Sequence, residues 1–583
     1  MAKSKTAKVP DAKPEIVDIS NKPSSGSKLQ KVWKKFKGNK KIAIPVTIVA
    51  IIGLVLLIPI TRYQVLGLFI QKNFNVMVVD SATGRPVSSA AIYLAGQTAQ
   101  TDNDGKATLH AKLGKSKLTA EKSYYNTAET NVTVTLTESK NNTQVSMVAT
   151  GRTVPVSVKN KITSEPVSNA TIQAEGTEVK TTADGKALIV LPVDKERVQA
   201  TVKGEGYNET KVQINVTDQE VDSNAFSVTP TGKVYFLSKK SGKYDVVKTN
   251  LDGTDRKVVV KGTGKEDDST ELITTRDWKY LVLHARRDSK QAKLYLIDTS
   301  SDKLSVIDEG DASFDIHGWA NHHLVYTVYR NNVPHWKSKH TALKSFNAED
   351  KKLTTIDENQ SVGKYEYDSS SENFSNIAIV DSSRLIYAKF WNYTDYYSDN
   401  LLKGKKSSII AVNADGGERQ ILKEYSAGTV AYMEVLQPKP QQVYMRVETY
   451  KDKYNYTYEA NYYIYDHGTF KNLNIDDDVE FYEMANVDTH ILPSPDGKST
   501  FWYERRDGKN SFFIGNENAD KANEVTSVEG YIPFGWYTDQ YLLATLKESE
   551  LYVMPRTGGS LLKFTDFQQS AGSYPGYNHG YGN

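Results

Sequence analysis

The stretch PVSSAAI at residues 86–92 returns as PVSNATI at residues 166–172, and TDNDGKA at 101–107 returns as TTADGKA at 181–187. Both pairs are 80 residues apart, and two separate matches at one offset indicate a duplicated unit. Around the matches, apolar and polar residues alternate over short runs bounded by Gly, Asp and Asn. Such alternation is typical of half-buried β-strands joined by turns, so the duplicated unit is predicted to be a β-sandwich.

The two predicted sandwiches span residues 74–150 and 153–221. Their pattern D…TGxPVxxAxI…TDxDGKA…Y resembles that of the carboxypeptidase-regulatory-like, transthyretin-related sandwich family. The resemblance implies stalk or binding modules without catalysis. Asp102, Asp104 and Asp184 raise the alternative of a calcium loop, but an Asp-Gly pair between strands is first of all a hairpin turn.

From residue 224 to residue 566, a longer pattern of predicted strands repeats about every 45–60 residues. Seven repeats of this length are found. Their second strands are expected at 233–238, 279–284, 323–329, 384–390, 442–448, 499–504 and 540–546. Units of four strands at this period predict a β-propeller, with seven blades as the first choice and six or eight as alternatives.

The turns of the predicted propeller carry a family resemblance. The sequences SPDGK at 494–498, NLDGT at 250–254 and NADGG at 413–417 resemble the turns of TolB-like propellers. Related propellers precede hydrolase domains in prolyl peptidases. The Gly-x-Ser-x-Gly elbow of such hydrolases does not occur in this sequence, so that activity is not carried over.

The run IAIPVTIVAIIGLVLLIPI at residues 42–60 contains no charged residue. As a helix at ~1.5 Å per residue, its 19 residues reach about 28 Å, close to the ~30 Å hydrocarbon core of a bilayer. No cleavage site for a signal peptide follows it. We therefore expect a single transmembrane α-helix in contact with membrane lipid, and a buried core helix or a cleaved signal peptide is the alternative.

Charge is divided unevenly between the two sides of this run. Residues 1–41 carry 12 Lys and three acidic residues, whereas the rest of the chain carries 61 basic and 67 acidic residues. Positive charge beside a spanning helix stays in the cytoplasm, which makes residues 1–41 a disordered cytoplasmic tail and places the bulk of the chain outside the membrane. The basic pI therefore does not indicate a nucleic-acid partner. Residues 567–583, rich in Gly and Tyr, are expected to form a second disordered tail.

Candidate binding residues come from three long loops between the second and third strands of neighbouring units, at 330–344, 391–407 and 450–460. Loops on a rigid scaffold often carry binding sites, and Tyr and Trp supply large contact areas for protein or glycan partners. The alternative is that the tyrosines pack against one another in extended hairpins. The candidates are Trp336, Trp391, Tyr393, Tyr396, Tyr397, Tyr450, Tyr454, Tyr456 and Tyr458.

Catalytic and metal-binding patterns are weak. The chain has no cysteine, which excludes thiol catalysis and iron–sulfur sites. Five of its ten histidines lie between 317 and 340, and a metal site would need several of them to converge with a carboxylate such as Asp315. Adjacent residues of a strand, such as His322 and His323, point in opposite directions, so we expect no metal and no cofactor.

The sequence thus predicts an all-β ectodomain, with two tandem β-sandwiches and a seven-bladed β-propeller, on a single transmembrane helix. The first functional hypothesis is a non-enzymatic, single-pass cell-envelope protein whose stalk presents the propeller for protein or glycan binding. The second is a propeller hydrolase or lyase, with acid and base residues converging at the central axis on the first strands 269–275 and 312–318. The third is an extracytoplasmic sensor that acts through a cytoplasmic partner.

Overall fold

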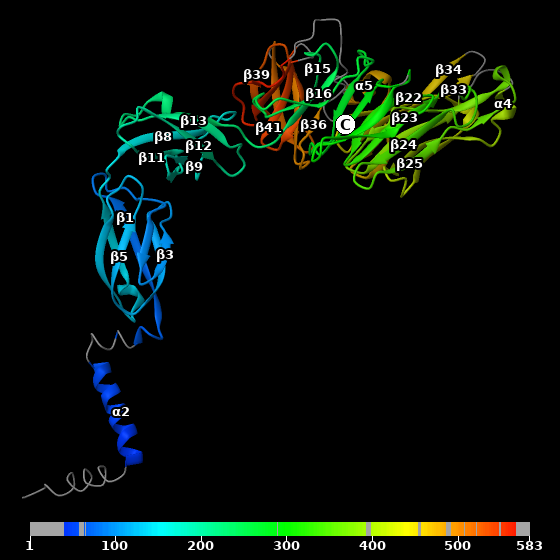
Figure 1. Ribbon diagram of the computed structural model, residues 1–583. Helices are drawn as coiled ribbons and strands as arrows, with labels where there is room; N and C mark the ends of the chain where they lie inside the picture. Colours follow the sequence, from blue (N-terminus) through cyan, green and yellow to red (C-terminus); the bar gives the residue numbers. More distant parts are fainter. Residues whose placement is uncertain are drawn as a thin grey trace, which may run out of the picture.

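The computed structural model describes residues 40–57, 63, 66–288, 290–391, 398–452, 456–485, 491–506, 508–520, 522–546 and 550–566. A helix, two small β domains and a larger β body follow one another along the chain (Figure 1). The predicted tails at 1–41 and 567–583 lie outside the described residues, apart from Lys40 and Lys41.

Helix α2 (Lys40–Leu57) covers most of the apolar run, with Pro45 inside the helix near its start. The side chains of Ile44, Val46, Ile48, Val49 and Ile51 are exposed. Within the described part of the chain, we find no helix with the length and apolar character needed to span a membrane. Residues 58–60 of the run lie outside the described residues, and the expected span over 42–60 stays a prediction.

The first sandwich consists of a three-stranded sheet in the order β4-β1-β7 and a four-stranded sheet in the order β3-β2-β5-β6. Alternate residues of β4 face inward, so Ala107, Leu109 and Ala111 are buried with Ile92 and Leu118 of the opposite sheet, as the period of two predicts. The strands are β1 (Gln71–Asp80), β2 (Ala91–Leu94), β3 (Gln97–Gln100), β4 (Lys106–Lys112), β5 (Gly114–Glu121), β6 (Ala128–Val134) and β7 (Asn142–Met147), with the short helix η1 (Glu138–Lys140) before β7.

The second sandwich repeats this topology, with sheets β11-β8-β14 and β10-β9-β12-β13. Its last strand β14 pairs in parallel with β8, as β7 does with β1, and this carries the domain past the boundary expected at residue 221. The elements are β8 (Arg152–Asn160), β9 (Thr171–Ala174), β10 (Thr177–Lys180), β11 (Lys186–Leu191), β12 (Arg197–Lys203), β13 (Thr210–Asn215), η2 (Asp222–Asn224) and β14 (Ala225–Val228).

Matching residues of the two repeats make the same contacts. The hydroxyl of Thr101 donates to Val87 O at 2.6 Å, and that of Thr181 donates to Val167 O at 2.6 Å. In the Asp-Gly turn of the first repeat, Gly105 has a φ of +70°, and an added Cβ would lie 2.5 Å from Val78 O. The Asp-Gly pairs therefore serve as tight turns that only glycine fits.

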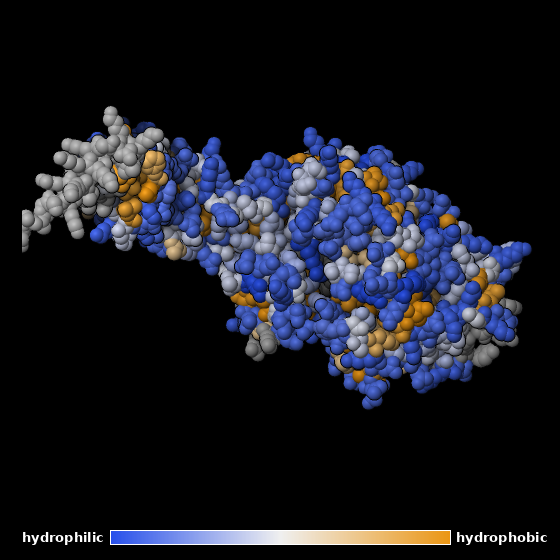
Figure 2. Space-filling model, turned by 90° about the horizontal axis from the view of Figure 1, so that it is seen from below, coloured by the Kyte–Doolittle hydropathy of each residue, from blue (hydrophilic) through white to orange (hydrophobic). Residues whose placement is uncertain are grey.

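The larger body is a propeller of seven consecutive antiparallel sheets, the number that the sequence predicts. We number them blade 1 (β15–β17), blade 2 (β18–β21), blade 3 (β22–β25), blade 4 (β26–β31), blade 5 (β32–β35), blade 6 (β36–β39) and blade 7 (β40–β43). Blade 1 has three strands, because β14, which precedes it, belongs to the second sandwich. On the side seen in Figure 2, the hydrophobic residues of the propeller form small separate patches on a mostly hydrophilic surface.

The strands of blades 1 to 4 are β15 (Val234–Ser238), β16 (Asp245–Thr249), β17 (Lys257–Val260), β18 (Glu271–Thr274), β19 (Tyr280–Ala285), β20 (Lys293–Asp298), β21 (Lys303–Asp308), β22 (Ala312–Ala320), β23 (His323–Arg330), β24 (Thr341–Asn347), β25 (Lys352–Glu358), β26 (Ser361–Val362), β27 (Ser370–Phe374), β28 (Ala378–Ile379), β29 (Arg384–Trp391), β30 (Lys406–Asn413) and β31 (Gln420–Ser426). Two short helices lie between strands of blade 4, η3 (Glu366–Asp368) and α4 (Ser398–Leu401), and η4 (Ala427–Thr429) follows the last strand of this blade.

The strands of blades 5 to 7 are β32 (Val430–Lys439), β33 (Gln442–Asp452), β34 (Thr457–Asp466), β35 (Thr469–Leu473), β36 (Leu492–Pro493), β37 (Ser499–Arg506), β38 (Lys509–Asn516), β39 (Asn523–Ser527), β40 (Tyr531–Thr538), β41 (Tyr541–Leu546), β42 (Glu550–Pro555) and β43 (Leu562–Lys563). Helix α5 (Asp478–Ala485) lies in the connection between blades 5 and 6.

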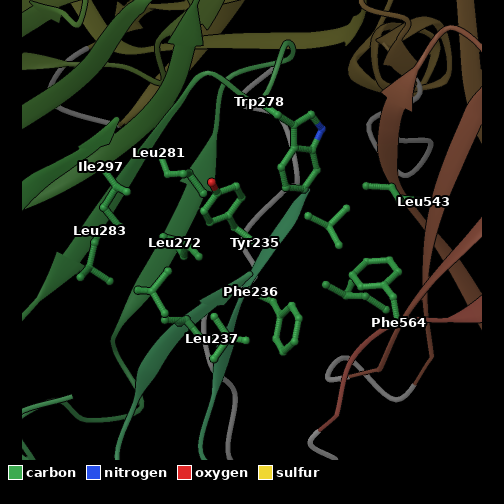
Figure 3. Close-up of a cluster of buried hydrophobic side chains, with 14 of the residues drawn as sticks. Tyr235, Phe236, Leu237, Leu272, Trp278, Leu281, Leu283, Ile297, Leu543 and Phe564 are labelled. Carbon is green, nitrogen blue, oxygen red and sulfur yellow. The ribbon is translucent and has the colours of Figure 1, made fainter. Parts of the chain in front are cut away.

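The ring closes where blade 7 packs against blade 1 (Figure 3). Phe564, just after β43, lies 6.3 Å from Phe236 of β15 between ring centroids. Asp566 accepts hydrogen bonds from Ser238 Oγ and from the guanidinium of Arg256, both in blade 1. The seam between the two end blades is therefore closed by side-chain packing and ion pairing.

The second sandwich is attached to the propeller at this same seam. Asn160 at the end of β8 donates to the hydroxyl of Tyr541 in blade 7 at 3.0 Å, and Lys161 pairs with Asp252 of blade 1 at 2.7 Å. Ile162 is buried in the apolar cluster that also contains Phe236 and Phe564. The second sandwich thus contacts both blades that meet at the seam.

Blades 3 and 4 are joined by a buried ionic cluster. Lys389 of β29 lies 2.9 Å from the carboxylate of Asp357 in blade 3 and 2.7 Å from that of Glu372 in blade 4. Asp357 also accepts from Tyr387 and Arg419, each at 2.7 Å. The side chains of Lys389, Asp357 and Glu372 are only 9–10% exposed. Because water does not solvate these charges well, the ammonium group and the two carboxylates must neutralise one another.

Candidate functional site

The loops of blade 3 form a raised ridge at one end of the blade. The loop 331–340 between β23 and β24 lies against residues 359–369, which follow β25 and include β26 at the start of blade 4. Lys339 N donates to Asn359 O at 3.0 Å, and Lys337 Nζ donates to Lys364 O at 3.2 Å. We call these two segments together the blade-3 ridge.

Three aromatic residues stand on the blade-3 ridge. Tyr365 and Tyr367 are stacked, with ring centroids 5.4 Å apart and an interplanar angle of 8°. They are 47% and 77% exposed, although large aromatic side chains are ordinarily buried. Trp336 is partly buried, and Lys337 Nζ lies 3.9 Å from the centroid of its ring. An exposed stacked pair offers a flat, rigid surface to a ligand.

Trp336 is among the binding residues predicted from the sequence, whereas Tyr365 and Tyr367 are not. Those two residues lie between β26 and β27 of blade 4, and the prediction covers only loops between second and third strands. The Tyr-x-Tyr spacing at 365–367 was the available signal. Tyr365 is the N-cap residue of helix η3 and Tyr367 is the middle residue of that helix, an arrangement that the spacing alone does not specify.

In blade 5 the second and third strands continue into an extended hairpin. Tyr450 and Tyr458 lie opposite each other on β33 and β34, with ring centroids 5.3 Å apart, so these two pack together as the alternative interpretation held. Tyr456, at the tip of the hairpin, is 68% exposed. Tyr454 lies outside the described residues.

Trp391 is corrected from a binding residue to a core residue. Its side chain is 1% exposed, packs with Leu402 and Ala427, and donates from Nε1 to Lys406 O at 3.1 Å. Leu402 and Ala427 pack against the indole, and Lys406 at the start of β30 supplies the acceptor for its N–H. Tyr393, Tyr396 and Tyr397 of the same loop lie outside the described residues.

Helix α5 adds aromatic surface between blades 5 and 6. Its buried Phe481 packs against Tyr444 and Tyr462 of blade 5, while Tyr482 is exposed and donates to Glu434 at 2.8 Å. At the N-terminus of the helix, Asp478 accepts two charge-assisted hydrogen bonds from Arg446. This carboxylate belongs to the acidic run 476–478, and its bonds to Arg446 hold α5 on blade 5.

A second cluster lies on the inner strands of blades 2 and 3. A β-bulge between Ile316 and Gly318 leaves His317 as the extra residue, and its Nε2 lies 2.7 Å from the hydroxyl of Thr327. Burial lowers the pKa of His317, although the nearby carboxylate of Asp315 opposes the shift. The imidazole is therefore neutral at pH 7. Bulges often reorient side chains beside active sites.

The neighbouring blade contributes another histidine and carboxylate to these strands. His284 of β19 lies 3.5 Å from Glu271 of β18 and packs edge-on against Phe314 of β22, with ring centroids 6.2 Å apart. Glu271, Asp315 and His317 thus lie on the first strands of blades 2 and 3, on which the enzyme hypothesis requires acid and base residues. His284 lies on β19, the second strand of blade 2.

Two other histidines between 317 and 340 have partners of their own. His322 lies between Asp277 and Glu349, at 2.9 and 2.6 Å, and His340 Nδ1 lies 2.7 Å from Val333 O. Among the residues that the structure describes, no group of three or more histidines and carboxylates could hold a metal ion.

A cleft of about 1090 Å³ lies between the two sandwich repeats. Its walls include the Asp-Gly turns of both repeats, through Asp104 and Asp184, and the basic side chains of Arg85 and Lys180. Beside the cleft, Lys122 of the first repeat donates to Glu178 O of the second at 3.2 Å, and burial lowers the pKa of its amine to about 8. The mixed charges on the walls do not single out a ligand.

The solved structures to which the chain is similar include β-propeller proteins. No family model and no curated protein matches the sequence. The chain is similar to oligogalacturonate lyase from Vibrio parahaemolyticus, with 13% identity, a TM-score of 0.29, and coverage of 57% of this chain and 84% of the lyase. It is also similar to the β-propeller domain of the Trilobed protease from Pyrococcus furiosus, with 11% identity, a TM-score of 0.29, and coverage of 64% of this chain and 96% of that domain. TolB from Acinetobacter baumannii is similar with 13% identity, a TM-score of 0.24, and coverage of 62% of this chain and 80% of TolB.

These neighbours correct one prediction. Most of them are propeller enzymes, including a prolyl endopeptidase, the tricorn protease and an acylaminoacyl peptidase as well as the lyase. The prediction that the protein is not an enzyme is therefore wrong, and we withdraw it. At these identities and TM-scores the similarities do not assign any of those activities to this chain.

Proposed function

We propose that the apolar segment around α2 holds the protein in a membrane and that the loop face of its propeller binds an extracytoplasmic glycan or protein. By loop face we mean the blade-3 ridge, the hairpin tip of blade 5 and helix α5. The observation that carries the binding role is the exposed, stacked pair of Tyr365 and Tyr367. Rigid aromatic rings of this kind dominate the energetics of many binding surfaces.

The membrane role is supported by the exposed apolar side chains of α2. Isoleucine and valine side chains left in water forgo roughly 1.5–3 kcal/mol each that burial would provide. The lysine-rich residues before the helix favour a cytoplasmic N-terminus, and the resemblance of the two sandwiches to transthyretin-related domains favours a stalk. Together these features support an envelope protein whose propeller stands away from the bilayer.

One experiment tests both parts of this proposal. The full-length protein is mixed with phosphatidylglycerol vesicles, floated on a density gradient, and the floated fraction is probed with an array of bacterial surface oligosaccharides. The double variant Ile48→Asp/Ile51→Asp should no longer float, since each charge at the centre of a span costs about 2.5–3.5 kcal/mol. Tyr367→Ala should float normally but bind its glycan at least about tenfold more weakly.

The control for the glycan arm is Tyr93→Ala, which removes an exposed tyrosine of the first sandwich. Glycan binding that is equal in wild type, Tyr93→Ala and Tyr367→Ala would contradict the loop-face proposal. Flotation of the Ile48→Asp/Ile51→Asp variant would contradict the membrane proposal.

A second candidate function is hydrolysis or elimination on a glycan or peptide at the inner strands of blades 2 and 3. The specific observation in its favour is His317, neutral at pH 7 and held by Thr327 at 2.7 Å. Thr327 is itself buried, so its hydroxyl orients the ring and is not an accessible nucleophile. In this candidate, His317 acts as general base and Asp315 stabilises the imidazolium that forms.

The test of the second candidate is the pH profile of any turnover found with the full-length protein. Because burial lowers the pKa of His317 below 6.5, base catalysis should persist at pH values where an ordinary histidine is protonated. His317→Asn should reduce the rate about 10²–10⁴-fold, and the exposed His110→Asn should leave it unchanged. A rate that survives His317→Asn would reject this candidate.

A further inference from the structure

The blade-3 ridge contains three lysines and two carboxylates, and among the described residues no ion pair involves one of these lysines. Its first segment, 331–340, contains Lys337 and Lys339 and no acidic residue, and its second segment contributes Lys364. The one ion pair that the described residues form within the ridge joins His335 to Glu366 at 3.6 Å, and it involves no lysine.

The acidic side chains of the ridge are used within the ridge itself. Asp368 Oδ1 accepts the backbone N–H groups of Lys364 and Tyr365, at 3.1 and 2.6 Å, and so closes the turn of helix η3. Glu366 faces His335. The carboxylates therefore stabilise the loop conformation, and the ammonium groups remain available to a ligand.

The lysines lie beside the aromatic rings. Lys337 Nζ is 3.9 Å from the centroid of the Trp336 ring, and Lys364 Nζ is 5.2 Å from that of Tyr365. Cation–π attraction keeps each ammonium group near its ring. Lys337 makes one hydrogen bond, to Lys364 O, and an ammonium group has three donors. Each ring is thus paired with a cation that can still donate hydrogen bonds.

We infer that the blade-3 ridge binds an acidic sugar polymer, whose ring faces stack on Tyr367 and Tyr365 while its carboxylate or phosphate groups pair with Lys337 and Lys364. This inference rests on the proposed binding role of the loop face and adds the charge of the ligand. The aromatic rings match the apolar faces of a sugar, and the lysines match an anion beside each ring. An acidic protein would match the lysines, but it offers no repeated flat face to the stacked tyrosines.

The test is a titration of the full-length protein with three polymers at low salt. Alginate combines sugar rings with carboxylates, dextran has sugar rings without charge, and polyphosphate has charge without sugar rings. Alginate should bind at least about tenfold more tightly than either of the others, and rising salt should weaken its binding. Lys337→Ala/Lys364→Ala and Tyr367→Ala should each reduce alginate affinity by about tenfold.

Matched controls lie in the first sandwich, where Lys115→Ala and Tyr93→Ala remove exposed residues of the same types and should leave alginate affinity unchanged. Dextran binding as tight as alginate binding, and insensitive to the lysine change, would overturn the acidic-polymer inference but leave the proposed loop-face function standing. Polyphosphate binding that equals alginate binding would overturn the stacking role. Failure of Tyr367→Ala to affect any glycan would overturn both proposals.

Discussion

Lys389→Ala is expected to lower the free energy of unfolding of the propeller by about 3–5 kcal/mol, because it removes the shared cation of a buried ionic cluster. Asp357 would retain Arg419 as a partner at 2.7 Å, so part of its charge stays compensated. Among the described residues, the carboxylate of Glu372 would then accept one hydrogen bond, from the backbone N–H of Gln360. This carboxylate is only 9% exposed. An uncompensated buried carboxylate is the main reason for the loss.

Urea denaturation followed by tryptophan fluorescence measures this effect. Lys471→Ala is the matched control, since Lys471 is 57% exposed, lies 3.8 Å from Asp466, and should contribute about 0–1 kcal/mol. The double variant Lys389→Met/Glu372→Gln should regain much of the loss, because it removes the buried charge together with its partner. Equal midpoints for Lys389→Ala and Lys471→Ala would contradict the assignment of Lys389 as a buried compensating cation.

Phe564→Ala should destabilise the propeller by a similar amount, about 3–5 kcal/mol, by opening a cavity between blades 7 and 1. Phe564 is buried against Phe236, and the two rings belong to opposite ends of the propeller chain. The seam has no covalent closure, so a cavity there weakens the contact between the end blades. We therefore expect local opening at the seam before global unfolding.

Amide hydrogen exchange distinguishes local opening from a general loss of stability. In Phe564→Ala, protection should fall first in β15 and β43, whereas Phe501→Ala should lower protection without favouring these strands. Phe501 is equally buried but packs against Phe512 and Trp536, away from the seam. Uniform loss of protection in Phe564→Ala would show that the seam is no weaker than the other blade contacts.

Local patterns in the sequence were enough to predict the strands, the duplication and the propeller. Alternation along β4 and the repeated Asp-Gly turns depend on neighbouring residues alone, so they can be read without knowledge of distant contacts. The parallel pairing of β14 with β8 could not be read in this way, because its two strands are far apart in the sequence and the register follows from the folded sandwich.

The binding surface was only partly predictable for the same reason. Loop length and aromatic content pointed to Trp336 and Tyr456, but neither property says whether a side chain turns outward. Trp391 turned inward because an acceptor in β30 lies within reach of its N–H. Tyr365 and Tyr367 became a surface only through the stacking that helix η3 imposes, which is a property of the three-dimensional turn.

The attachment of the second sandwich to blades 1 and 7 has a mechanical consequence. If a ligand pulls on the far side of the ring while the N-terminal end is held, the tension passes through Asn160, Lys161 and Ile162 into the two end blades. Because these three residues contact both blades, the load is shared between the two end blades. The propeller should therefore resist traction applied through its stalk better than traction applied directly across blades 1 and 7.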